Sequence, residues 1–166
     1  MSTQDNLKAA FAGESQANRK YLAFAQKAEK EGFPQVAKLF RAAAEAETVH
    51  AHSHLRVMGG IKATAENLQA AIEGEGYEFQ TMYPDFIKMA ETEGNKPAVN
   101  TFKNAMAVEK EHHTLYSTAL AAIKGGKDVA ATKIYVCKVC GHTVCGGPED
   151  KCPICGAKKD QFFEVA

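Results

Sequence analysis

Apolar residues recur every three or four positions between Thr3 and Lys124, the spacing that places them on one face of an α-helix. The stretch is rich in Ala, Glu, Lys, Gln and Leu, which lose little conformational freedom on entering a helix. Four turn sequences interrupt it, EGFP, GG, EGNKP and KGGKD, beginning at positions 31, 59, 93 and 124. The pattern predicts four long helices, which favour an all-α four-helix bundle over residues 1–127.

The pattern changes after KGGKD. Residues 133–166 carry β-prone side chains and tight Gly and Pro turns, and they show no helical period. A segment of this length buries too little apolar surface to be stable by burial alone. We therefore expect a second, small, β-rich domain that is held together by something other than a hydrophobic core.

The charge balance and the cysteines limit the classes of partner and cofactor that we expect for the chain. The chain has 20 basic and 20 acidic residues, so we expect no nucleic acid partner. No run approaches the roughly 20 apolar residues that span a bilayer, and the first residues do not resemble a secretory signal, so we expect a soluble cytoplasmic protein without a membrane partner. All five cysteines lie between Cys137 and Cys155, and in a cytosolic chain such a cluster indicates a metal before it indicates disulfides.

Four of these cysteines form two metal-binding knuckles, Cys137-x-x-Cys140-Gly and Cys152-Pro-x-Cys155-Gly. Four thiolates around one ion would stabilise a domain that cannot stabilise itself. Tetrahedral sulfur coordination suits either zinc or iron, and the spacing alone does not decide between them. Cys145 lies between the knuckles without a partner, and we expect a free thiol there.

The helical part contains an internal repeat with an offset of 61 or 62 residues. The matching pairs are Gly13-Glu14 with Gly74-Glu75, Glu31-Gly32 with Glu93-Gly94, and the Glu-x-x-His sequence starting at Glu47 with the one starting at Glu109. The first two helices should therefore form a hairpin that resembles the hairpin of the last two.

Carboxylates and histidines gather at one level of these hairpins. Helix positions three apart share a face, so each Glu-x-x-His pair presents a carboxylate beside an imidazole. Helical rise puts Glu14 about 26 Å before the first turn and Glu47 about 20 Å after it, which brings the two close together. A Glu from each of two helices plus Glu-x-x-His from the other two is typical of a di-iron or di-manganese site. The candidate ligands are Glu14, Glu47, His50, Glu75, Glu109 and His112.

Three further positions lie near the candidate ligands: Glu78, His52 and His54. Glu78 stands one turn beyond Glu75, and its repeat counterpart is Ala17, so it is either a seventh ligand or an exposed acidic side chain near a helix start. His52 and His54 follow the first ligand pair, Glu47 and His50, along the chain. At the repeat offset only His50 meets another histidine, so we expect His54 in a supporting or packing role and His52 in solvent.

Four sequences, in this order along the chain, resemble signatures of the rubrerythrin family. They are FAGESQA at 11–17, the two Glu-x-x-His pairs, GEGYEFQTMYP at 74–84, and CKVCG with CPICG near the end. The resemblance implies a ferritin-like bundle with a non-haem di-iron centre and a C-terminal rubredoxin-like Fe(Cys)4 domain. It also implies peroxide reductase activity in defence against oxidative stress.

The resemblance also implies roles for particular residues. Two irons would be held by Glu14, Glu47, His50, Glu75, Glu78, Glu109 and His112, and one iron by Cys137, Cys140, Cys152 and Cys155. Glu47 and Glu109 would bridge the two irons, and one iron would exchange His50 for Glu78 as its oxidation state changes. Tyr21 and Tyr83 match tyrosines close to the centre, where they would bond to ligand carboxylates; the alternative for each is core packing.

The implied reaction is the reduction of hydrogen peroxide to water, with electrons returned singly by the Fe(Cys)4 site. The electron donor would be an NAD(P)H-dependent reductase or a small redox protein such as rubredoxin. One alternative is a ferroxidase or iron-storage protein with the same bundle. Another is a non-catalytic helical module carrying a zinc ribbon. The metal content and colour of the protein distinguish an iron enzyme from a module that binds zinc.

The connection between the second and third helices suggests a dimer. In the ferritin-like topology these helices run parallel, and the connection would have to span about 27 Å along the axis. GGIKA at 59–63 reaches about 17 to 20 Å when fully extended. Either the bundle runs simply up and down, or a homodimer exchanges helical hairpins. The family fold favours the domain-swapped dimer, in which each di-iron site takes Glu14, Glu47 and His50 from one chain and Glu75, Glu78, Glu109 and His112 from the other.

Overall fold

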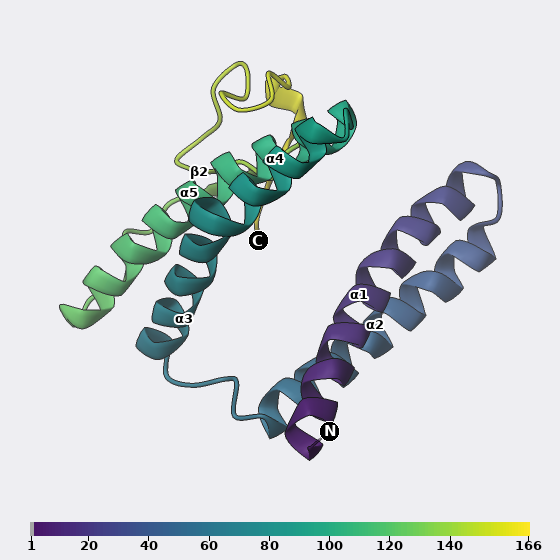
Figure 1. Cartoon of the computed structure of the whole chain (residues 1–166), viewed down its shortest axis with the longest axis horizontal. Helices are drawn as coiled ribbons and strands as arrows, with labels where there is room; N and C mark the ends of the chain where they lie inside the picture. Colours follow the sequence, from purple (N-terminus) through teal and green to yellow (C-terminus); the bar gives the residue numbers. More distant parts are fainter. Residues whose placement is uncertain (1) are drawn as a thin grey trace. The chain divides into compact units, whose positions relative to one another are not determined.

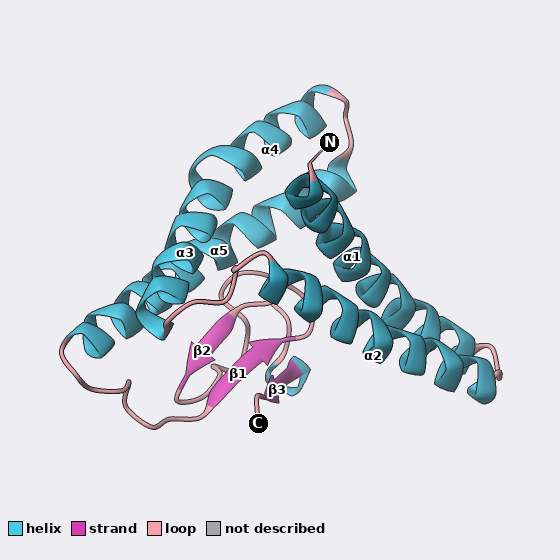
Figure 2. Ribbon diagram, turned by 90° about the horizontal axis from the view of Figure 1, so that it is seen from below, coloured by secondary structure: helices cyan, strands magenta, loops and turns pink. Residues whose placement is uncertain are grey.

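The computed structural model describes residues 2–166 and divides the chain into two compact units. The first unit ends at Lys62, and the second runs from Ala63 to Ala166. In the described residues, the first unit has two helices and no strand, whereas the second combines helices with a small sheet, as Figure 1 and Figure 2 show.

The first unit is an antiparallel hairpin of α1 (Thr3–Lys30) and α2 (Pro34–Val57). A capping box fixes the start of α1: the Ser2 hydroxyl accepts the Asp5 N–H, and the Asp5 carboxylate accepts the Ser2 N–H. Gly32, with φ of 83°, makes the turn that reverses the chain. Both helices and their turn lie where the sequence predicts them.

The interface between α1 and α2 is made of small side chains. Its buried residues are all alanines: Ala25, Ala28, Ala37, Ala44 and Ala51. Alanine lets two helices approach closely but buries little apolar area. Larger apolar side chains of the same hairpin stay exposed, with Phe24 at 47% and Leu39 at 68%. A solvated face of this kind is typical of a surface that another element covers.

The second unit contains a matching helical hairpin. One arm consists of α3 (Thr64–Tyr77), the π-helix η1 (Glu78–Met82) and α4 (Tyr83–Thr92), and the other arm is α5 (Lys96–Lys124). The sequence therefore predicts the correct helical segments and turns. It does not predict that the third segment contains a π-helical turn, which interrupts an otherwise continuous helix.

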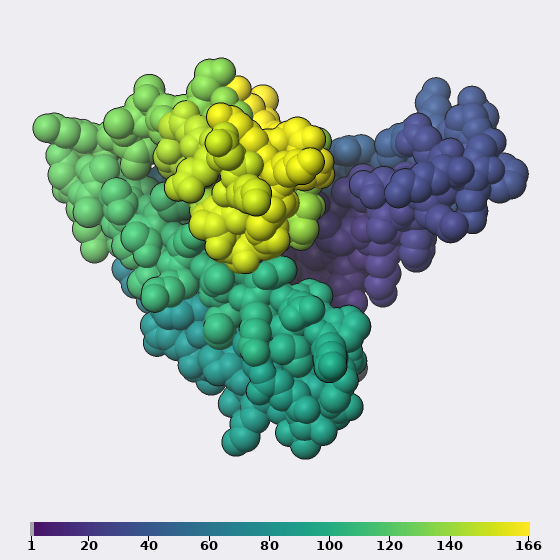
Figure 3. Space-filling model, turned by 90° about the horizontal axis from the view of Figure 1, so that it is seen from above, coloured from purple at the N-terminus to yellow at the C-terminus, as the bar shows by residue number. Residues whose placement is uncertain are grey.

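The small C-terminal domain forms an antiparallel sheet in the order β2-β1-β3. The strands are β1 (Ile134–Cys137), β2 (Thr143–Cys145) and β3 (Phe162–Glu164), and the 3-10 turn η2 (Lys159–Gln161) precedes the last of them. This confirms the predicted β-rich second part. In the space-filling view of Figure 3 its yellow residues pack against the green surface of α5.

The described residues 2–166 include no helix that is long and apolar enough to cross a membrane.

Candidate metal centres

The first unit brings three predicted ligands together, and we call this group the first half-site: Glu14, Glu47 and His50. Glu14 comes from α1, and the other two come from α2. One ligand atom of each lies within 4.8 Å of the other two, and His50 Nδ1 is 2.9 Å from Glu47 Oε2. Ligands on one first-row metal ion stand at most about 4.4 Å apart, so a small adjustment would let the three bind one ion.

The second unit repeats this arrangement in a second half-site: Glu75, Glu109 and His112. His112 Nδ1 lies 2.9 Å from Glu109 Oε2 and 3.7 Å from Glu75 Oε1. This half-site is less exposed than the first, since the His112 side chain is 25% exposed and that of His50 is 55% exposed. Both predicted hairpins thus present two carboxylates beside one imidazole, and each hairpin supplies half of the predicted ligand set.

Electrostatics in the second half-site favour a cation. Burial, the neighbouring Glu109 carboxylate and a hydrogen bond with it raise the pKa of Glu75 to about 7. Burial also raises the pKa of Glu109, against the hydrogen bond from Glu75. Two carboxylates that share a proton in this way carry negative charge that a metal ion would neutralise when it replaces that proton. The donor set therefore fits a hard or intermediate metal ion.

Tyr83 and Glu78 lie close enough to this half-site to affect it. The pKa of the Tyr83 phenol is raised by burial and then by the Glu109, Glu78 and Glu75 carboxylates, so its hydroxyl keeps its proton. Glu78 raises the pKa of both half-site carboxylates. It lies outside the group whose ligand atoms converge, and its role as a seventh ligand stays a prediction.

Each hairpin also carries an aromatic cluster at the same place in the repeat. The clusters are Tyr21, Phe24 and Phe40 in the first unit and Tyr83, Phe86 and Phe102 in the second. The Phe24 and Phe40 rings lie 5.6 Å apart, as do the Phe86 and Phe102 rings. Tyr21 and Tyr83 therefore both sit in aromatic contacts, and a hydrogen bond from either to a ligand carboxylate stays a prediction.

The π-helix explains the change of repeat offset from 61 to 62 residues. Glu14 and Glu75 are related by 61 residues, whereas Tyr21 and Tyr83 are related by 62, so one residue is added between these points. Residues 78–82 form the π-helical turn, which accommodates one extra residue within a helix. Its first residue is Glu78, whose counterpart in α1 is the non-ligating Ala17. The one-residue shift in the repeat was the sequence signal for this turn.

The four predicted cysteines converge in the small domain. Cys137 Sγ lies 3.8 Å from Cys155 Sγ, and Cys140 Sγ lies 3.6 Å from Cys152 Sγ. Metal–sulfur bonds of 2.3 Å in a tetrahedron separate the sulfur atoms by about 3.8 Å, so the four thiols fit one zinc or iron ion. Burial alone would raise the pKa of the Cys137 thiol, but N–H groups of Cys140 and Val139 and neighbouring sulfurs lower it. That thiol is thus prepared to bind as a thiolate.

The remaining cysteine is not part of this group. Cys145 is the last residue of strand β2 and is exposed, whereas the sequence predicts it in a loop between the two knuckles.

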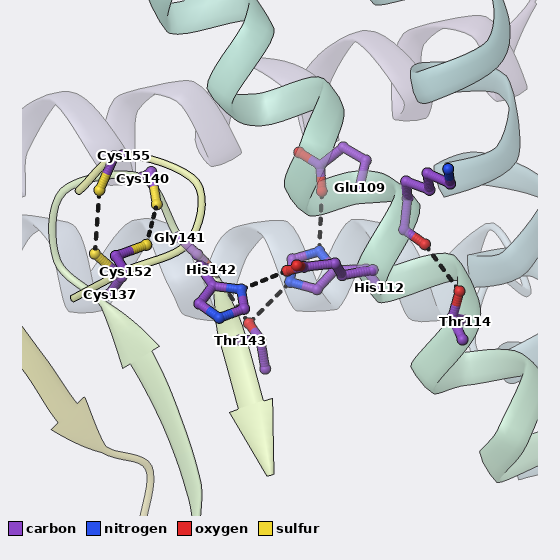
Figure 4. A network of polar contacts seen from close by, with 12 residues as sticks. Glu109, His112, Thr114, Cys137, Cys140, Gly141, His142, Thr143, Cys152 and Cys155 are labelled. Carbon is purple, nitrogen blue, oxygen red and sulfur yellow. Dashed lines mark hydrogen bonds and ion pairs between the residues drawn. The ribbon is translucent and has the colours of Figure 1, made fainter. Parts of the chain in front are cut away.

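The small domain also contacts the second half-site, which sequence reasoning missed. Thr143 Oγ1 lies 2.9 Å from His112 Nε2, as Figure 4 shows. His142 Nδ1 lies 2.6 Å from Glu111 Oε2. These partners are 31 residues apart and belong to different predicted domains, so no periodicity relates them. The only sequence signal was the adjacency of His142 and Thr143 to a metal-binding knuckle.

Two carboxylate–histidine half-sites on paired helices, together with a four-thiol site, are typical of an iron protein with a di-metal and a mononuclear centre. The family model described as "Rubrerythrin" matches residues 5–120, and the model described as "Rubrerythrin, rubredoxin-like domain" matches residues 135–163. The chain belongs to the rubrerythrin family, with a di-iron domain followed by a rubredoxin-like domain.

Several named proteins resemble the chain over almost its whole length. Rubrerythrin-2 of Clostridium acetobutylicum is 37% identical and the match covers 96% of this chain and 95% of the relative. Nigerythrin of Nitratidesulfovibrio vulgaris is 38% identical, over 97% of this chain and 85% of the relative. A solved structure titled as a partially reduced state of nigerythrin has a TM-score of 0.59 at 36% identity, covering 99% of this chain and 87% of that one. A second is titled as its fully reduced, all-ferrous state.

Proposed function

We propose that the protein is a non-haem di-iron peroxidase that reduces hydrogen peroxide to water: one peroxide takes up two electrons and two protons and gives two water molecules. One observation carries the proposal. The four-thiol site and the second half-site belong to the same compact unit, and the Thr143–His112 contact joins them. A ferroxidase or storage protein has no need of a thiolate-bound iron held against a di-iron ligand, whereas a peroxidase must be re-reduced after each turnover.

The proposed ligands of the iron pair are the members of the two half-sites together with Glu78. The resemblance to the rubrerythrin family implies that Glu47 and Glu109 would be the carboxylates shared by the two irons, and each lies beside a histidine of its own helix that would bind one of them. When bound, a ferrous pair supplies two electrons to the O–O bond of peroxide. The carboxylates neutralise the four positive charges of such a pair, and exchange of His50 for Glu78 would adjust one iron to its oxidised state.

Tyr83 is proposed to hold a ligand carboxylate in position through its hydroxyl group. Its raised pKa keeps the phenol protonated beside Glu75, Glu78 and Glu109. A hydroxyl of this kind can donate a hydrogen bond to a ligand carboxylate and hold that carboxylate in position. Tyr21 occupies the matching place in the first unit and is proposed to do the same for the first half-site.

Electrons are proposed to enter through the site formed by Cys137, Cys140, Cys152 and Cys155, with iron as the bound metal. An NAD(P)H-dependent reductase or a rubredoxin would supply them one at a time, in the cytoplasm. The similar protein nigerythrin has been solved in partially reduced and all-ferrous states, which supports a redox role for the bound irons.

Stopped-flow spectroscopy of the iron-loaded protein tests the activity. Ferric iron bound by four thiolates is red, so the reduced protein should regain its colour when mixed with peroxide. We expect recolouring to be at least about tenfold slower in His112→Ala, which keeps the thiolate site but loses a ligand of the iron pair. Equal rates in the two proteins would overturn the proposal, and reaction with ferrous iron and dioxygen but not peroxide would favour a ferroxidase.

We further propose that the ferritin-like bundle, residues 1–127, closes between two chains that exchange hairpins, with residues 133–166 as the rubredoxin-like domain of each. Glu47 and Glu75 lie about 15 and 16 Å of helical rise from the ends of α2 and α3 that face the connection. A connection between parallel helices would have to span both distances. Residues 58–63 reach at most about 25 Å, and hydrogen bonds from Gly59 and Gly60 back to α2 shorten this further. Light scattering of the iron-loaded protein should show a dimer, whereas a monomer with an intact iron pair would exclude the exchange.

A further inference from the structure

The small domain touches α5 through two adjacent residues on each side. Glu111 and His112 of α5 meet His142, which directly precedes β2, and Thr143, which begins it. Neighbouring residues on a helix point about 100° apart, so Glu111 and His112 leave α5 in different directions. Two contacts that diverge in this way fix both the position and the rotation of the small domain on the helix (Figure 4).

His142 is built into the small domain and cannot move independently of it. It is only 9% exposed, its carbonyl accepts the N–H of Cys137, and its ring packs edge-on against Phe162 at 6.0 Å. From this fixed position Nδ1 donates to Glu111 Oε2 at 2.6 Å. A short hydrogen bond to a carboxylate is among the stronger polar contacts in proteins, so this pair is suited to hold the domain in place.

An apolar contact lies beside the polar ones. Val108 of α5 is 3% exposed and lies beneath Gly141, where a side-chain carbon would come within 3.8 Å of it. Val108, Glu111 and His112 occupy one face of α5, because they are separated by three and four residues. The docking surface therefore consists of a buried valine with a charged residue and a predicted metal ligand one turn further on.

Thr143 constrains the imidazole of His112. The Thr143 hydroxyl donates its one hydrogen to the Gly141 carbonyl at 3.1 Å, so toward His112 it can only accept. His112 must then carry a hydrogen on Nε2, at 2.9 Å from the hydroxyl. Nδ1, which faces Glu75 and Glu109, is left free to bind a metal ion. The small domain thus orients a ligand of the di-iron centre.

We propose that Glu111 and His142 form the docking contact of the rubredoxin-like domain, and that Thr143 is a positioning residue for His112 within the same chain. This rests on the proposed function only in taking His112 as an iron ligand. The contact completes a continuous path of covalent and hydrogen bonds from Cys140 through Gly141 and Thr143 to His112. The helical part would therefore receive a correctly oriented ligand only when the rubredoxin-like domain of that chain is docked.

Hydrogen–deuterium exchange of the iron-loaded, full-length protein tests docking without reference to activity. Glu111→Gln keeps the size of the side chain but removes its charge, and Lys110→Gln is the matched control on the exposed neighbouring position. We expect amide exchange over residues 141–145 to rise about tenfold in the first variant, because a hydrogen bond to a charged acceptor becomes a weaker one to a neutral amide oxygen. Lys110→Gln should match the unmodified protein.

Proton NMR of the full chain loaded with zinc tests the role of Thr143. Zinc is diamagnetic, so the Nε2–H proton of His112 should be seen as a slowly exchanging downfield signal. Thr143→Val, which keeps the shape but removes the hydroxyl, should lose this signal, whereas Thr132→Val on an exposed position should retain it. An unchanged signal in Thr143→Val, or unchanged exchange in Glu111→Gln, overturns the proposal even if the protein proves to be a peroxidase. If both variants change as expected but the protein has no peroxidase activity, the docking proposal stands and only the proposed enzyme activity is rejected.

Discussion

Nδ1 of His112 lies 2.9 Å from Oε2 of Glu109, and the same distance separates His50 from Glu47 in the other hairpin. Identical spacing in two units shows that the repeat extends from the sequence to the geometry of its polar side chains. Each helical hairpin brings its carboxylates and imidazole together, and in the second unit the small domain also contacts the imidazole. A metal ion would therefore meet ligands that already converge, which lowers the cost of ordering them on binding.

Replacing one half-site histidine should remove the iron pair and leave the thiolate iron. We expect His112→Ala to retain about one iron per chain and its red colour, because the four cysteines do not depend on this side chain. His52→Ala is the matched control, since the first half-site contains no ligand atom of His52. Metal analysis with a visible spectrum measures both sites. Loss of colour in His112→Ala would show that the two sites fold together instead.

The cysteine site should tolerate loss of Cys145 but not of Cys152. Cys152→Ser replaces a buried thiolate by a poor iron ligand, so it should lose the red colour, and residues 133–166 should become sensitive to protease. Cys145→Ser alters an exposed side chain at the end of β2 and should leave the spectrum and protease resistance unchanged. A colour change in the Cys145 variant would mean that this thiol is a ligand after all.

Stability of the metal-free protein should fall as pH rises toward neutrality. The pKa of Glu75 is about 7 in the folded chain against an ordinary 4.5, so between these values the folded state holds a proton that the unfolded state releases. The stabilisation is complete below pH 4.5 and is lost as pH passes 7. Because the group is only partly buried, the loss should be about 1 kcal/mol.

Urea unfolding of the metal-free protein, followed by helical circular dichroism at pH 5, 6 and 8, measures this effect. Glu75→Gln is the control: its amide resembles the protonated acid, so the decline with pH should shrink. Iron must displace the same proton, so iron affinity should fall by up to about tenfold per pH unit below 7. A rise in stability from pH 5 to 8 would contradict the assignment.

The sequence predicts the parts of this protein better than their junctions. Local patterns of a few residues predict the alanine-rich helices, the Gly and Pro turns and the paired Cys-x-x-Cys knuckles. The structure has these elements where the patterns place them. The repeat also carried a signal for the π-helix, because its offset grows from 61 residues at Glu75 to 62 residues at Tyr83. This one-residue shift indicates a π-helix only once the helix is known to be continuous. The Glu111–His142 contact had no local signal, because its partners are distant in sequence and only folding brings them together.

Mixing two inactive variants tests the proposed exchange of hairpins directly. Glu47→Ala disables the half-site of the first unit, and Glu109→Ala disables that of the second. Each variant alone should lack an intact iron pair. If hairpins are exchanged, a mixed dimer contains one site with both defects and one site with none, because the intact first unit of one chain meets the intact second unit of the other.

Co-expression with two different affinity tags allows the mixed dimer to be isolated. We expect it to bind about one iron pair per dimer and to recover about half of the peroxidase activity of the unmodified protein. The control is a mixed dimer of Glu47→Ala with a Glu47→Ala, Glu109→Ala chain, in which every exchanged site keeps a defect. A bundle closed within each chain predicts no recovery in either mixture, since each site would retain the defect of its own chain. Recovery in the first mixture and not in the second is therefore the outcome that only hairpin exchange produces.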